Sequence, residues 1–444
     1  MEVPTHVEQL LAALRAGGFV ACPVGGCVRD SLLGRAPGDW DLCTSARPEQ
    51  VKACAAPRWR ALDTGIAHGT VTVLTGDGPV EVTTFRVEGG YSDHRRPDGV
   101  RFVADLEEDL ARRDFTINAM ALDEGGIVDP FGGRADLAAG FIRCVGEPAR
   151  RFEEDALRIL RALRFASCLD FSIEPATLAA ARAAAPTLTR VSAERVFAEL
   201  DKLLLGPGAG RVLAQCGDIL AHAVPAIGPC LGFDLRSPRH ELDLWGHIAR
   251  AVGLAPPRRN VRWALLLHDL AKPDCFVLDG QGFGHAPGHA ARGAVLAKEV
   301  LARLKAPGRL VQGVQPLVRW HDTPLPQDTP GVRRWLGRWG WPTLEDLIAV
   351  KRADLLAHAD GPVIRRRLQE TARFEKLARQ AHRRGDCVRV DQLAVSGADL
   401  MNAGVCRAGP RMGRLLGAAL NEVIEGRVEN HPAALLAWAR KQKR

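Results

Sequence analysis

The adjacent glycines Gly25 and Gly26 separate an apolar run from a helix-like run, and this junction constrains the fold more than any other stretch. Residues 19–24 (FVACPV) predict a strand and residues 27–33 (CVRDSLL) predict a helix. The start of a helix presents amide groups without intrahelical partners and the positive end of the helix dipole. We therefore predict that the glycine turn cradles a phosphate chain, with Arg29 adding a charged contact.

Two aspartates follow in a segment that predicts a strand, DWDLC. Side chains two positions apart in a strand point to the same side, so Asp39 and Asp41 are expected together. Glu81 lies in a second strand-like run, residues 80–86, which follows a glycine-bearing turn at residues 76–78. A hairpin through that turn is expected to lay Glu81 beside the two aspartates.

Three carboxylates in this arrangement suit Mg²⁺, which prefers oxygen ligands and shares them with substrate phosphates. Two such ions about 4 Å apart can clamp the attacking and leaving oxygens of a phosphoryl displacement. We predict Asp39, Asp41 and Glu81 as catalytic residues, with Asp39 and Asp41 holding the Mg²⁺. Taken singly, a glycine pair is an ordinary turn and Asp-x-Asp is a solvated strand end, so the prediction depends on their combination.

The combination of GGxVRD, DxDL and EVTTFR resembles the nucleotidyltransferase head of the class II tRNA nucleotidyltransferases and bacterial poly(A) polymerases, in the polymerase β superfamily. Residues 86–104 predict a mobile loop between head strands and resemble the flexible loop of CCA-adding enzymes, which relatives that add only two cytidines tend to lack. The matching positions are Tyr91, Asp93, Arg95, Arg96, Pro97 and Asp98.

The composition indicates a globular protein of several domains, because the chain has 444 residues, 46% of them hydrophobic and 25% charged. A net charge of +8 suits a polyanionic partner without specifying a nucleic acid. The eleven cysteines show no CxxC spacing, and residues 1–18 predict an amphipathic helix rather than a signal peptide. No apolar run is long enough to span a membrane, so we expect a cytoplasmic protein with reduced thiols.

The first third of the chain alternates strand-like and helical segments, whereas the remainder is rich in Ala, Leu and Arg at helical spacing. We predict an α+β fold. With the resemblance, this becomes a polymerase-β-like head with a mixed sheet and helices, followed by an all-α neck, a helical body and a helical tail. The predicted domains are residues 1–145, 146–225, 226–375 and 376–444. Chain breaks are expected near residues 206–208, 228–238 and 382–389.

Residues 109–121 (DLARRDFTINAMA) place a polar cluster ahead of apolar positions. The run closely matches the ribose-recognising motif of the family. The match implies that Arg113 and Asp114 lie near the sugar hydroxyls and that Asn118 orients them. Judged from this run alone, Arg112 and Arg113 could instead be plain surface charges.

Asp155 and Arg158 open the neck in the run RFEEDALR and, at i and i+3, are predicted to share one helical face. One interpretation is an exposed ion pair. Alternatively, the carboxylate accepts from an exocyclic amine and the guanidinium donates to the adjacent ring nitrogen, an edge that cytosine and adenine share and that uracil and guanine lack. The EDxxR pattern resembles the base-reading element of class II CCA-adding enzymes, with Glu154 helping to fix Arg158.

A second constellation of ligand-type residues lies within residues 239–360. It consists of His247, His268, Asp269 and Asp354. The order resembles the HD phosphohydrolase superfamily, which implies a metal site in an HD-type body, although a His-Asp doublet alone is common by chance. Mixed imidazole and carboxylate ligands suit Ni²⁺, Mn²⁺ or Co²⁺ better than Mg²⁺ alone. His289 and His321 are candidates for a second metal or for supporting contacts.

Two further patterns concern the C-terminal half. Four tryptophans between residues 320 and 341 predict core packing in preference to a base-stacking platform. The glycine-punctuated tail, residues 396–430, resembles the C-terminal RNA-anchoring domain of many bacterial CCA-adding enzymes. The resemblance therefore covers nearly the whole chain.

The resemblance implies an enzyme that adds C, C and A to the 3′ end of tRNA from CTP and ATP and releases pyrophosphate. The expected partners are the tRNA 3′ end, CTP and ATP, with no obligatory protein partner and no membrane. An added HD phosphohydrolase activity, for example on 2′,3′-cyclic phosphate ends, is also expected.

Alternatives within the class are an A-adding or CC-adding enzyme and a poly(A) polymerase. The loop at residues 86–104 argues against CC-only addition, and the tail argues against a poly(A) polymerase. From other classes, an HD phosphohydrolase with an inert head and a non-catalytic tRNA-binding protein are disfavoured by the intact pair Asp39 and Asp41.

Overall fold

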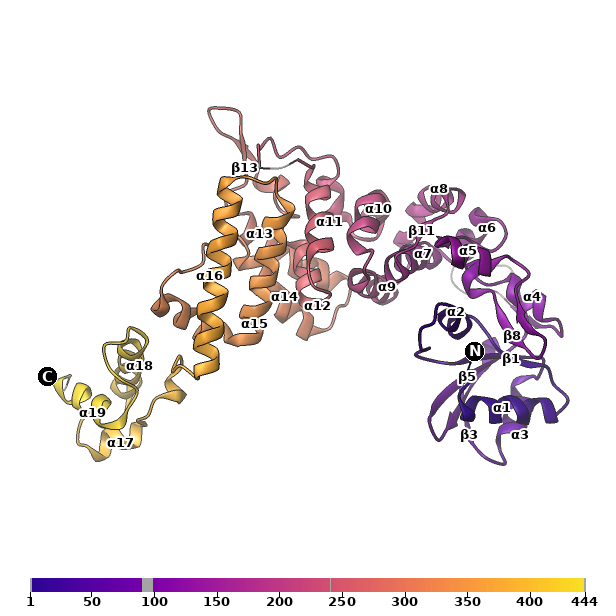
Figure 1. The fold of residues 1–444 in the computed structure, drawn as a ribbon, viewed down its shortest axis with the longest axis horizontal. Coiled ribbons are helices and arrows are strands. Elements are labelled where there is room, and N and C mark those ends of the chain that lie inside the picture. The colour runs from indigo at the N-terminus through magenta and orange to yellow at the C-terminus, as the bar shows by residue number, and fades with distance from the viewer. Residues whose placement is uncertain (1, 90–98, 240, 443–444) are drawn as a thin grey trace. The chain divides into compact units, whose positions relative to one another are not determined.

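The computed structural model describes residues 2–89, 99–239 and 241–442. The chain divides into two compact units, residues 1–228 and 229–444, and each is described by itself (Figure 1). The first unit contains the predicted head and neck, and the second contains the predicted body and tail.

The head is built on a five-stranded mixed sheet with the strand order β1-β2-β5-β4-β3. Strand β2 runs parallel to β5, whereas the other neighbours are antiparallel. The strands are β1 Ala21–Pro23, β2 Asp41–Thr44, β3 Arg60–Gly65, β4 Thr70–Thr75 and β5 Gly78–Thr84. The hairpin predicted through residues 76–78 is present, and it brings β5 beside β2.

Helices α1 (Thr5–Ala16) and α3 (Pro48–Ala55) pack side by side in the head (Figure 1). Helix α1 forms because its apolar residues recur at i, i+3, i+4 and i+7 and give one continuous apolar face. The buried residues of this face are Val7, Leu10, Leu11 and Leu14. Helix α2 (Gly26–Leu32) follows β1 directly across the glycine turn, as predicted.

Short elements complete the head. They are η1 Ile66–His68, β6 Arg86–Glu88, β7 Val100–Phe102, α4 Leu106–Ala111, η2 Thr116–Asn118, β8 Ala121–Asp123, β9 Gly126–Val128, α5 Gly133–Ala139 and β10 Phe141–Ile142. The bridge between Val24 and Ala121 ties β8 to the end of β1. A hydrophobic core that includes Cys22, Phe85 and Leu110 lies beneath these elements.

The neck is helical apart from a two-residue strand, β11 (Ser172–Ile173), which pairs in parallel with β10. Its helices are α6 Pro148–Glu154, α7 Leu157–Leu169, α8 Pro175–Ala184, η3 Ala185–Arg190, α9 Ala193–Leu205 and α10 Ala209–Ala223. Helices α7 and α9 pack against each other along their apolar faces. A mixed sheet followed by helices confirms the predicted α+β class.

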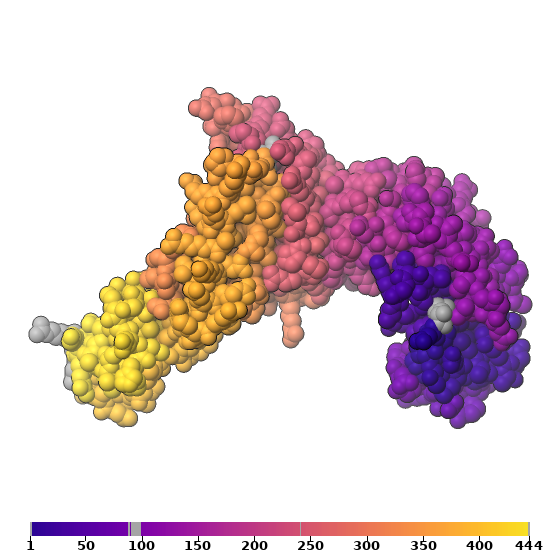
Figure 2. Space-filling view, in the orientation of Figure 1, coloured from indigo at the N-terminus to yellow at the C-terminus, as the bar shows by residue number. Residues whose placement is uncertain are grey.

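The second unit is a helical body followed by a small helical tail (Figure 1). The body helices are α11 Leu244–Leu254, α12 Arg259–Leu267, α13 His289–Arg303, α14 Gly308–Trp320, α15 Thr329–Ala357 and α16 Pro362–Arg384, and the tail helices are α17 Gly397–Asn402, α18 Pro410–Ile424 and α19 Pro432–Lys441. The 3-10 helix η4 Pro225–Cys230 precedes the body helices, and the single turns η5 Pro273–Cys275 and η6 Val390–Gln392 lie in later connections. The hairpin of β12 (Val277–Leu278) and β13 (Gly284–His285) projects from the body surface (Figure 2).

One sequence-based expectation needs correction. The stretch at residues 86–104 is not a loop throughout, because β6 and β7 pair at its base. The six positions that matched the flexible loop, Tyr91, Asp93, Arg95, Arg96, Pro97 and Asp98, lie outside the described residues. The proposed boundary between body and tail, after residue 375, lies within α16, which ends at Arg384.

The four tryptophans between residues 320 and 341 are half-buried, and Trp320, Trp335 and Trp339 pack against one another and against arginines. The ring of Trp320 meets Trp335 and Trp339 edge-on, with centroids 6.0 and 5.8 Å apart. The Arg338 guanidinium lies 4.6 Å from the Trp320 ring centre. Packing thus accounts for these rings, in line with the prediction. Among the residues that the structure describes, no helix has both the length and the apolar character of a membrane span.

Candidate functional site

Three carboxylates gather where β2 begins. Asp41 is the first residue of β2 and stands opposite Glu81 in the parallel ladder with β5. Asp39 lies two residues earlier, in a bend rather than in the strand, so the predicted strand starts later than expected. Trp40 between them is buried, whereas Asp39 and Glu81 are exposed. The ligand-type side chains at this position are carboxylates, so the site offers oxygen ligands.

The charges of these groups act on one another. Burial is the main cause that raises the pKa of Asp41 to about 6, and the negative charges of Asp39 and Glu81 add to the rise. The positive charge of Arg113 opposes it. Repulsion of this kind is relieved when a divalent cation binds, and partly exposed carboxylate oxygens suit Mg²⁺. The residues present therefore fit the predicted ion. Among the described residues, two groups of three or more ligand-type residues have ligand atoms that all lie within 4.8 Å of one another. Both of these groups are in the body and neither is in the head.

The glycine turn has a second close neighbour. Gly25 has a φ of 78°, a conformation that side chains disfavour, and a Cβ there would lie 3.1 Å from Arg113 Nη1. The Gly25 amide donates to the Met120 carbonyl at 3.0 Å, so it serves the fold and not the predicted phosphate cradle. The guanidinium of Arg113 is thus close to both the glycine turn and Asp41, a position that the sequence did not reveal.

Arg29 is held away from its predicted role at the phosphate chain. Its side chain is buried, its Nε and Nη2 atoms donate to Asp30 at 2.8 and 2.9 Å, and Nη1 donates to Asn118 Oδ1 at 2.7 Å. Asn118 Nδ2 donates to Asp114 at 3.3 Å, and Arg161 Nε of α7 donates to the same carboxylate at 2.7 Å. Three of the predicted nucleotide-binding residues therefore belong to one hydrogen-bond chain that joins head to neck.

The arginine pair at residues 112 and 113 is not a set of plain surface charges. Arg112 and Arg113 approach the fully buried Asp109 carboxylate at 2.8 and 3.2 Å. Burial alone would raise the pKa of Asp109, but these two guanidiniums lower it below its usual range. Asp114 behaves similarly, since the arginines of α7 outweigh burial and lower its pKa to about 2. Both carboxylates are therefore ionised and fixed in place.

Asp155 and Arg158 do not share a helical face, which corrects the prediction. Helix α6 ends at Glu154, Asp155 is extended (φ −143°, ψ 106°), and α7 begins at Leu157. Asp155 accepts from the Leu157 amide at 3.0 Å and from Arg195 of α9 at 2.7 Å. Arg158 donates to Glu154 at 2.6 Å, the contact that the family pattern implied. The two groups meet at a junction of helices, each held by different partners.

In the body, the four predicted metal ligands converge from three helices. His247 lies in α11, His268 and Asp269 lie at the end of α12, and Asp354 lies in α15. The Nε2 atom of His247 is 3.0 Å from Asp354 Oδ1 and 3.6 Å from Asp269 Oδ2. The Nε2 atom of His268 is 3.1 Å from Asp269 Oδ2 and 3.6 Å from Asp354 Oδ1. This cluster, called the HD cluster below, is buried except for the partly exposed Asp354.

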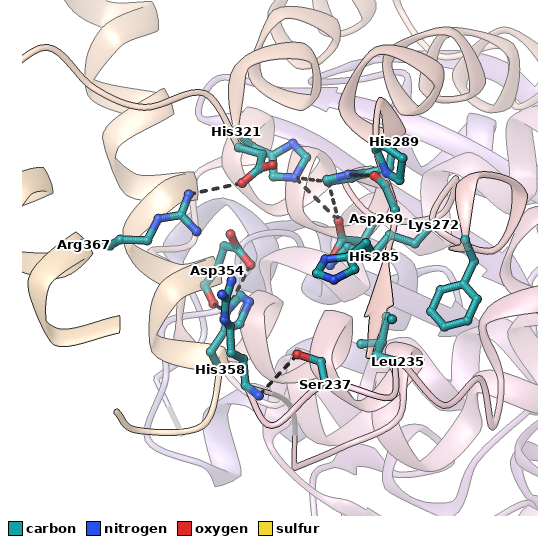
Figure 3. Close-up of a pocket in the computed structure, with 16 residues that line it drawn as sticks. Leu235, Ser237, Asp269, Lys272, His285, His289, His321, Asp354, His358 and Arg367 are labelled. Carbon is teal, nitrogen blue, oxygen red and sulfur yellow. Dashed lines mark hydrogen bonds and ion pairs between the residues drawn. The ribbon is translucent and has the colours of Figure 1, made fainter. Parts of the chain in front are cut away.

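A second group of ligand atoms adjoins the HD cluster. Asp269 Oδ1 lies 3.4 Å from His289 Nε2 and 3.5 Å from His321 Nε2, and the two Nε2 atoms are 3.2 Å apart (Figure 3). Both groups open onto a cavity of about 360 Å³. Its lining also includes Lys272 and Arg367, so cations surround an anionic centre (Figure 3).

Burial and charge decide the protonation of these groups. Burial would lower the pKa of His268, but the Asp269 and Asp354 carboxylates raise it to about 10. The pKa of Asp269 is well below its usual range because His268 and Lys272 outweigh its burial. Burial lowers the pKa of His289. Both Asp269 oxygens and His268 Nε2 lack a hydrogen bond of ordinary geometry, as expected of atoms that fit a metal ion.

Several contributing residues were missed at the sequence level. Arg161 and Arg195 hold Asp114 and Asp155 from the neck helices α7 and α9. In the body, Lys272 follows Asp269 at i+3, and its Nζ lies 2.6 Å from Asp269 Oδ2. The spacing of three residues from Asp269, a predicted ligand, was the signal in the sequence that could have pointed to Lys272.

Family models match most of the chain in succession. The Poly A polymerase head domain matches residues 21–143, an RNA- and SrmB-binding site of polymerase A matches 170–218, the HD domain matches 243–359, and tRNA nucleotidyltransferase domain 2 matches 355–439. The head match agrees with the predicted polymerase-β-like fold.

Similar proteins cover the whole chain. A CCA-adding enzyme of Geobacillus stearothermophilus is 35% identical over 440 residues, which are 98% of this chain and 96% of that protein. A CCA-adding enzyme of Enterococcus faecalis is 37% identical over 451 residues, 99% of this chain and 97% of that protein. The crystal structure of the Bacillus stearothermophilus CCA-adding enzyme in complex with CTP has a TM-score of 0.73 at 32% identity, covering 100% of this chain and 98% of that one.

Proposed function

The chain belongs to the family of the CCA-adding enzymes, and from that membership we propose that it adds C, C and A to the 3′ end of tRNA, using CTP and ATP and releasing pyrophosphate. It is a tRNA nucleotidyltransferase with a polymerase-β-like head and an HD domain. We place the reaction in the cytoplasm, and we keep the four-part division into head, neck, body and tail.

The observation that carries the proposal is the position of Asp41, opposite Glu81 in the ladder and just after Asp39. These carboxylates would hold Mg²⁺, which supplies charge neutralisation and alignment at the reacting phosphate. The 3′-hydroxyl oxygen of the tRNA forms a bond to the α-phosphorus while the bond from that phosphorus to the α,β-bridging oxygen breaks, pyrophosphate leaves, and the hydroxyl proton passes to solvent. Catalysis then consists of positioning and electrostatic stabilisation.

Arg113 and the glycine turn give the triphosphate its place. The turn formed by Gly25 and Gly26 allows close approach, and the Arg113 guanidinium beside it adds a fixed positive charge. Asn118 and Asp114 stand in the hydrogen-bond chain toward α7, which suits the positioning of a ribose. Arg29 completes this chain through Asn118, so we assign it a supporting role in the same site.

The base is selected in the neck. Arg195 holds the Asp155 carboxylate and Glu154 holds the Arg158 guanidinium, so the position of each side chain is fixed. A carboxylate acceptor beside a guanidinium donor matches the edge shared by cytosine and adenine. A wrong base would leave buried polar groups unpaired at about 1–3 kcal/mol each.

The test is incorporation of labelled CTP and ATP into tRNA transcripts that end before CCA, after C or after CC, followed by mass analysis of the products. Full CCA addition to the first transcript supports the proposal. Extension of only the transcript that ends in CC would indicate an A-adding enzyme. Addition of long adenosine runs would indicate a poly(A) polymerase. A lack of any incorporation would overturn the assignment of the head.

A second function belongs to the body, where the HD cluster fits a metal-dependent phosphohydrolase. The convergence of His247, His268, Asp269 and Asp354 supports it, since a purely structural body needs none of them as ligands. We propose phosphoesters of RNA ends, such as 2′,3′-cyclic phosphates, as substrates, with Ni²⁺, Mn²⁺ or Co²⁺ as the metal. The assay is hydrolysis of a cyclic-phosphate nucleotide with each metal, beside the double variant His268→Ala, Asp269→Ala. No hydrolysis with any metal would contradict it.

A further inference from the structure

The face of the head sheet that carries Asp41 and Glu81 continues across β5 and β4 as a group of threonines. In the ladder, Glu81 of β5 stands opposite both Asp41 of β2 and Thr72 of β4. Two positions further along β5, Thr83 stands opposite Thr70. Side chains that are directly opposite each other, or two apart on one strand, lie on the same face of a sheet. The threonines therefore share a face with the two carboxylates.

This face is the one that a ligand can reach. The opposite face is filled by valines that alternate with the threonines and are fully buried, and α3 packs against the same strands; these valines are Val71, Val73, Val80 and Val82. On the threonine face, Glu81 and Thr64 of β3 are exposed, and Thr70 and Thr83 are half-buried. Thr72 is 7% exposed, but its hydroxyl contacts that of the exposed Thr64.

The four threonines Thr64, Thr70, Thr72 and Thr83, called the threonine patch below, form two hydroxyl pairs. The Oγ1 atoms of Thr64 and Thr72 are 2.7 Å apart, and those of Thr70 and Thr83 are 3.0 Å apart. A hydroxyl has one donor and two acceptor positions, so a pair that uses one donor keeps a second O–H group and several lone pairs. A ribose 2′-hydroxyl is likewise both donor and acceptor. The uncharged threonine patch thus suits a sugar hydroxyl better than a phosphate.

The direction of attack places the tRNA end on the same side as the threonine patch. The triphosphate is assigned to the glycine turn at the end of β1, where Gly25 adjoins Arg113. The strand order β1-β2-β5-β4-β3 puts that turn on one side of Asp41 and the threonine patch on the other. In a phosphoryl transfer, the attacking and leaving oxygens lie roughly in line. Since pyrophosphate leaves toward β1, the attacking hydroxyl approaches from β5 and β4.

The distances suit a single nucleotide. Neighbouring strands are about 4.8 Å apart, so the threonine patch begins about 5 Å beyond Glu81 and about 10 Å from Asp41. We propose that the threonine patch binds the 2′-hydroxyl of the terminal nucleotide of tRNA and so positions its 3′-hydroxyl for attack. This inference deepens the proposed nucleotide addition by the head and rests on it for the direction of attack. The ribose of the incoming nucleotide is assigned elsewhere, to Asp114 and Asn118.

The test compares tRNA transcripts that end after the first C, with either ribose or 2′-deoxyribose in the terminal nucleotide. The double variant Thr72→Val, Thr83→Val removes one hydroxyl from each pair and keeps the strands, because valine favours strands. The natural protein should add CTP to the ribose end with a kcat/KM about 10-fold higher than to the deoxyribose end. The double variant should lose this preference, through a loss on the ribose end alone, while its KM for CTP stays unchanged.

Thr75→Val is the matched control. Thr75 lies on β4 two positions after the buried Val73, so it belongs to the opposite face, and its hydroxyl donates to the Gly78 carbonyl at 2.6 Å. This variant should keep the preference for the ribose end. A loss of equal size for both ends in the double variant, or an unchanged preference, would overturn the inference and leave the threonine patch a structural role in the sheet.

A binding measurement separates this inference from the proposed function. A fluorescent acceptor-stem minihelix, ending after the first C in ribose or in 2′-deoxyribose, is titrated with each protein in the absence of CTP. A ribose preference that the double variant loses supports the threonine patch, and equal binding of both ends by the natural protein contradicts it. If the natural protein adds no nucleotide, the proposed function of the head is wrong, whereas the binding result still decides the role of the threonine patch.

Discussion

The two acidic clusters of this protein differ in every physical respect that governs metal binding. In the head, Asp39, Asp41 and Glu81 lie at the start of β2 and on the neighbouring strand β5, and Asp39 and Glu81 are exposed. In the body, the HD cluster is closed by three helices, and Asp269 and His268 are at most 1% exposed. The head offers oxygen ligands alone, whereas the body offers oxygen and nitrogen.

These differences suit two kinds of metal use. Widely spaced carboxylates leave coordination positions for substrate oxygens, so an ion can enter the head together with the triphosphate. Ligands held in place by carbonyl contacts and buried from water suit an ion that stays in the body between turnovers. On this proposal the head would hold an exchangeable ion and the body a resident one, and the experiments below test each side of that difference.

The largest effect is expected from Asp41→Ala in the head. Loss of this ligand should slow nucleotide addition by about 10³-fold or more, because charge neutralisation at the phosphate is lost. Binding of tRNA should remain nearly intact, since the neck and tail supply RNA affinity. Incorporation of labelled CTP and gel-shift titration with tRNA measure the two effects.

Asp77→Ala is the matched control, because Asp77 is an exposed aspartate in the turn before β5. It should leave addition unchanged, and metal content of the body should be unchanged in both variants. If Asp41→Ala and the natural protein had comparable turnover, the assignment of Asp41 as a metal ligand in the head would be wrong.

Removal of metal should destabilise the body and spare the head. An ion that binds only the folded state at 100 times its Kd contributes about 2.7 kcal/mol. A chelator should therefore lower the melting temperature of the unit at residues 229–444 while that of the unit at residues 1–228 stays constant. Calorimetry of the full chain with and without reloading measures both transitions. If the chelator shifted the melting temperatures of both units equally, the proposal of a resident ion in the body and an exchangeable ion in the head would be wrong.

Arg158→Ala should reduce discrimination of CTP and ATP against UTP and GTP by roughly 10-fold, since it removes a donor that opposes the ring N–H of the wrong bases. Kinetic constants for the four nucleotides measure the effect. Arg182→Ala, which removes an exposed neck arginine paired with Asp218, serves as the control. Unchanged selectivity with lowered stability would reduce Arg158 to a structural partner of Glu154.

The smallest effect concerns pH. The pKa of Asp41 is about 6, so Mg²⁺ affinity of the head should be constant above pH 7 and fall about tenfold per pH unit below 6, where the carboxyl is protonated. In the metal-free body, His268 has a pKa of about 10, so metal must displace its proton and affinity should rise with pH between 7 and 9. Isothermal titration in buffers of different ionisation enthalpy counts the released protons. A flat body profile would contradict the ion pair of His268 with Asp269.

Local patterns predicted the head elements well because neighbours in sequence decide them. The alternation of side-chain types along the chain predicted the strands around Asp41 and Glu81. The glycine at position 25 predicted a turn, and Gly25 there has a positive φ. The break at Asp155 escaped the helical pattern, since the residue is drawn out of the helix by a contact with Arg195, forty positions away. The same limit hid the contacts of Arg29 with Asn118, which lie far apart in the chain.

The sequence by itself determined the kinds of ligand, their order and the class of each domain, because residue chemistry and periodicity are local properties. Tertiary packing alone decided which atoms meet. The spacing of His247, His268 and Asp354 is compatible with many arrangements, and only the approach of α11, α12 and α15 brings their ligand atoms together. Likewise, that Asp269 turns one oxygen to each of two imidazole groups follows from helices α13 and α14 packing against α12, since long-range packing fixes side-chain direction.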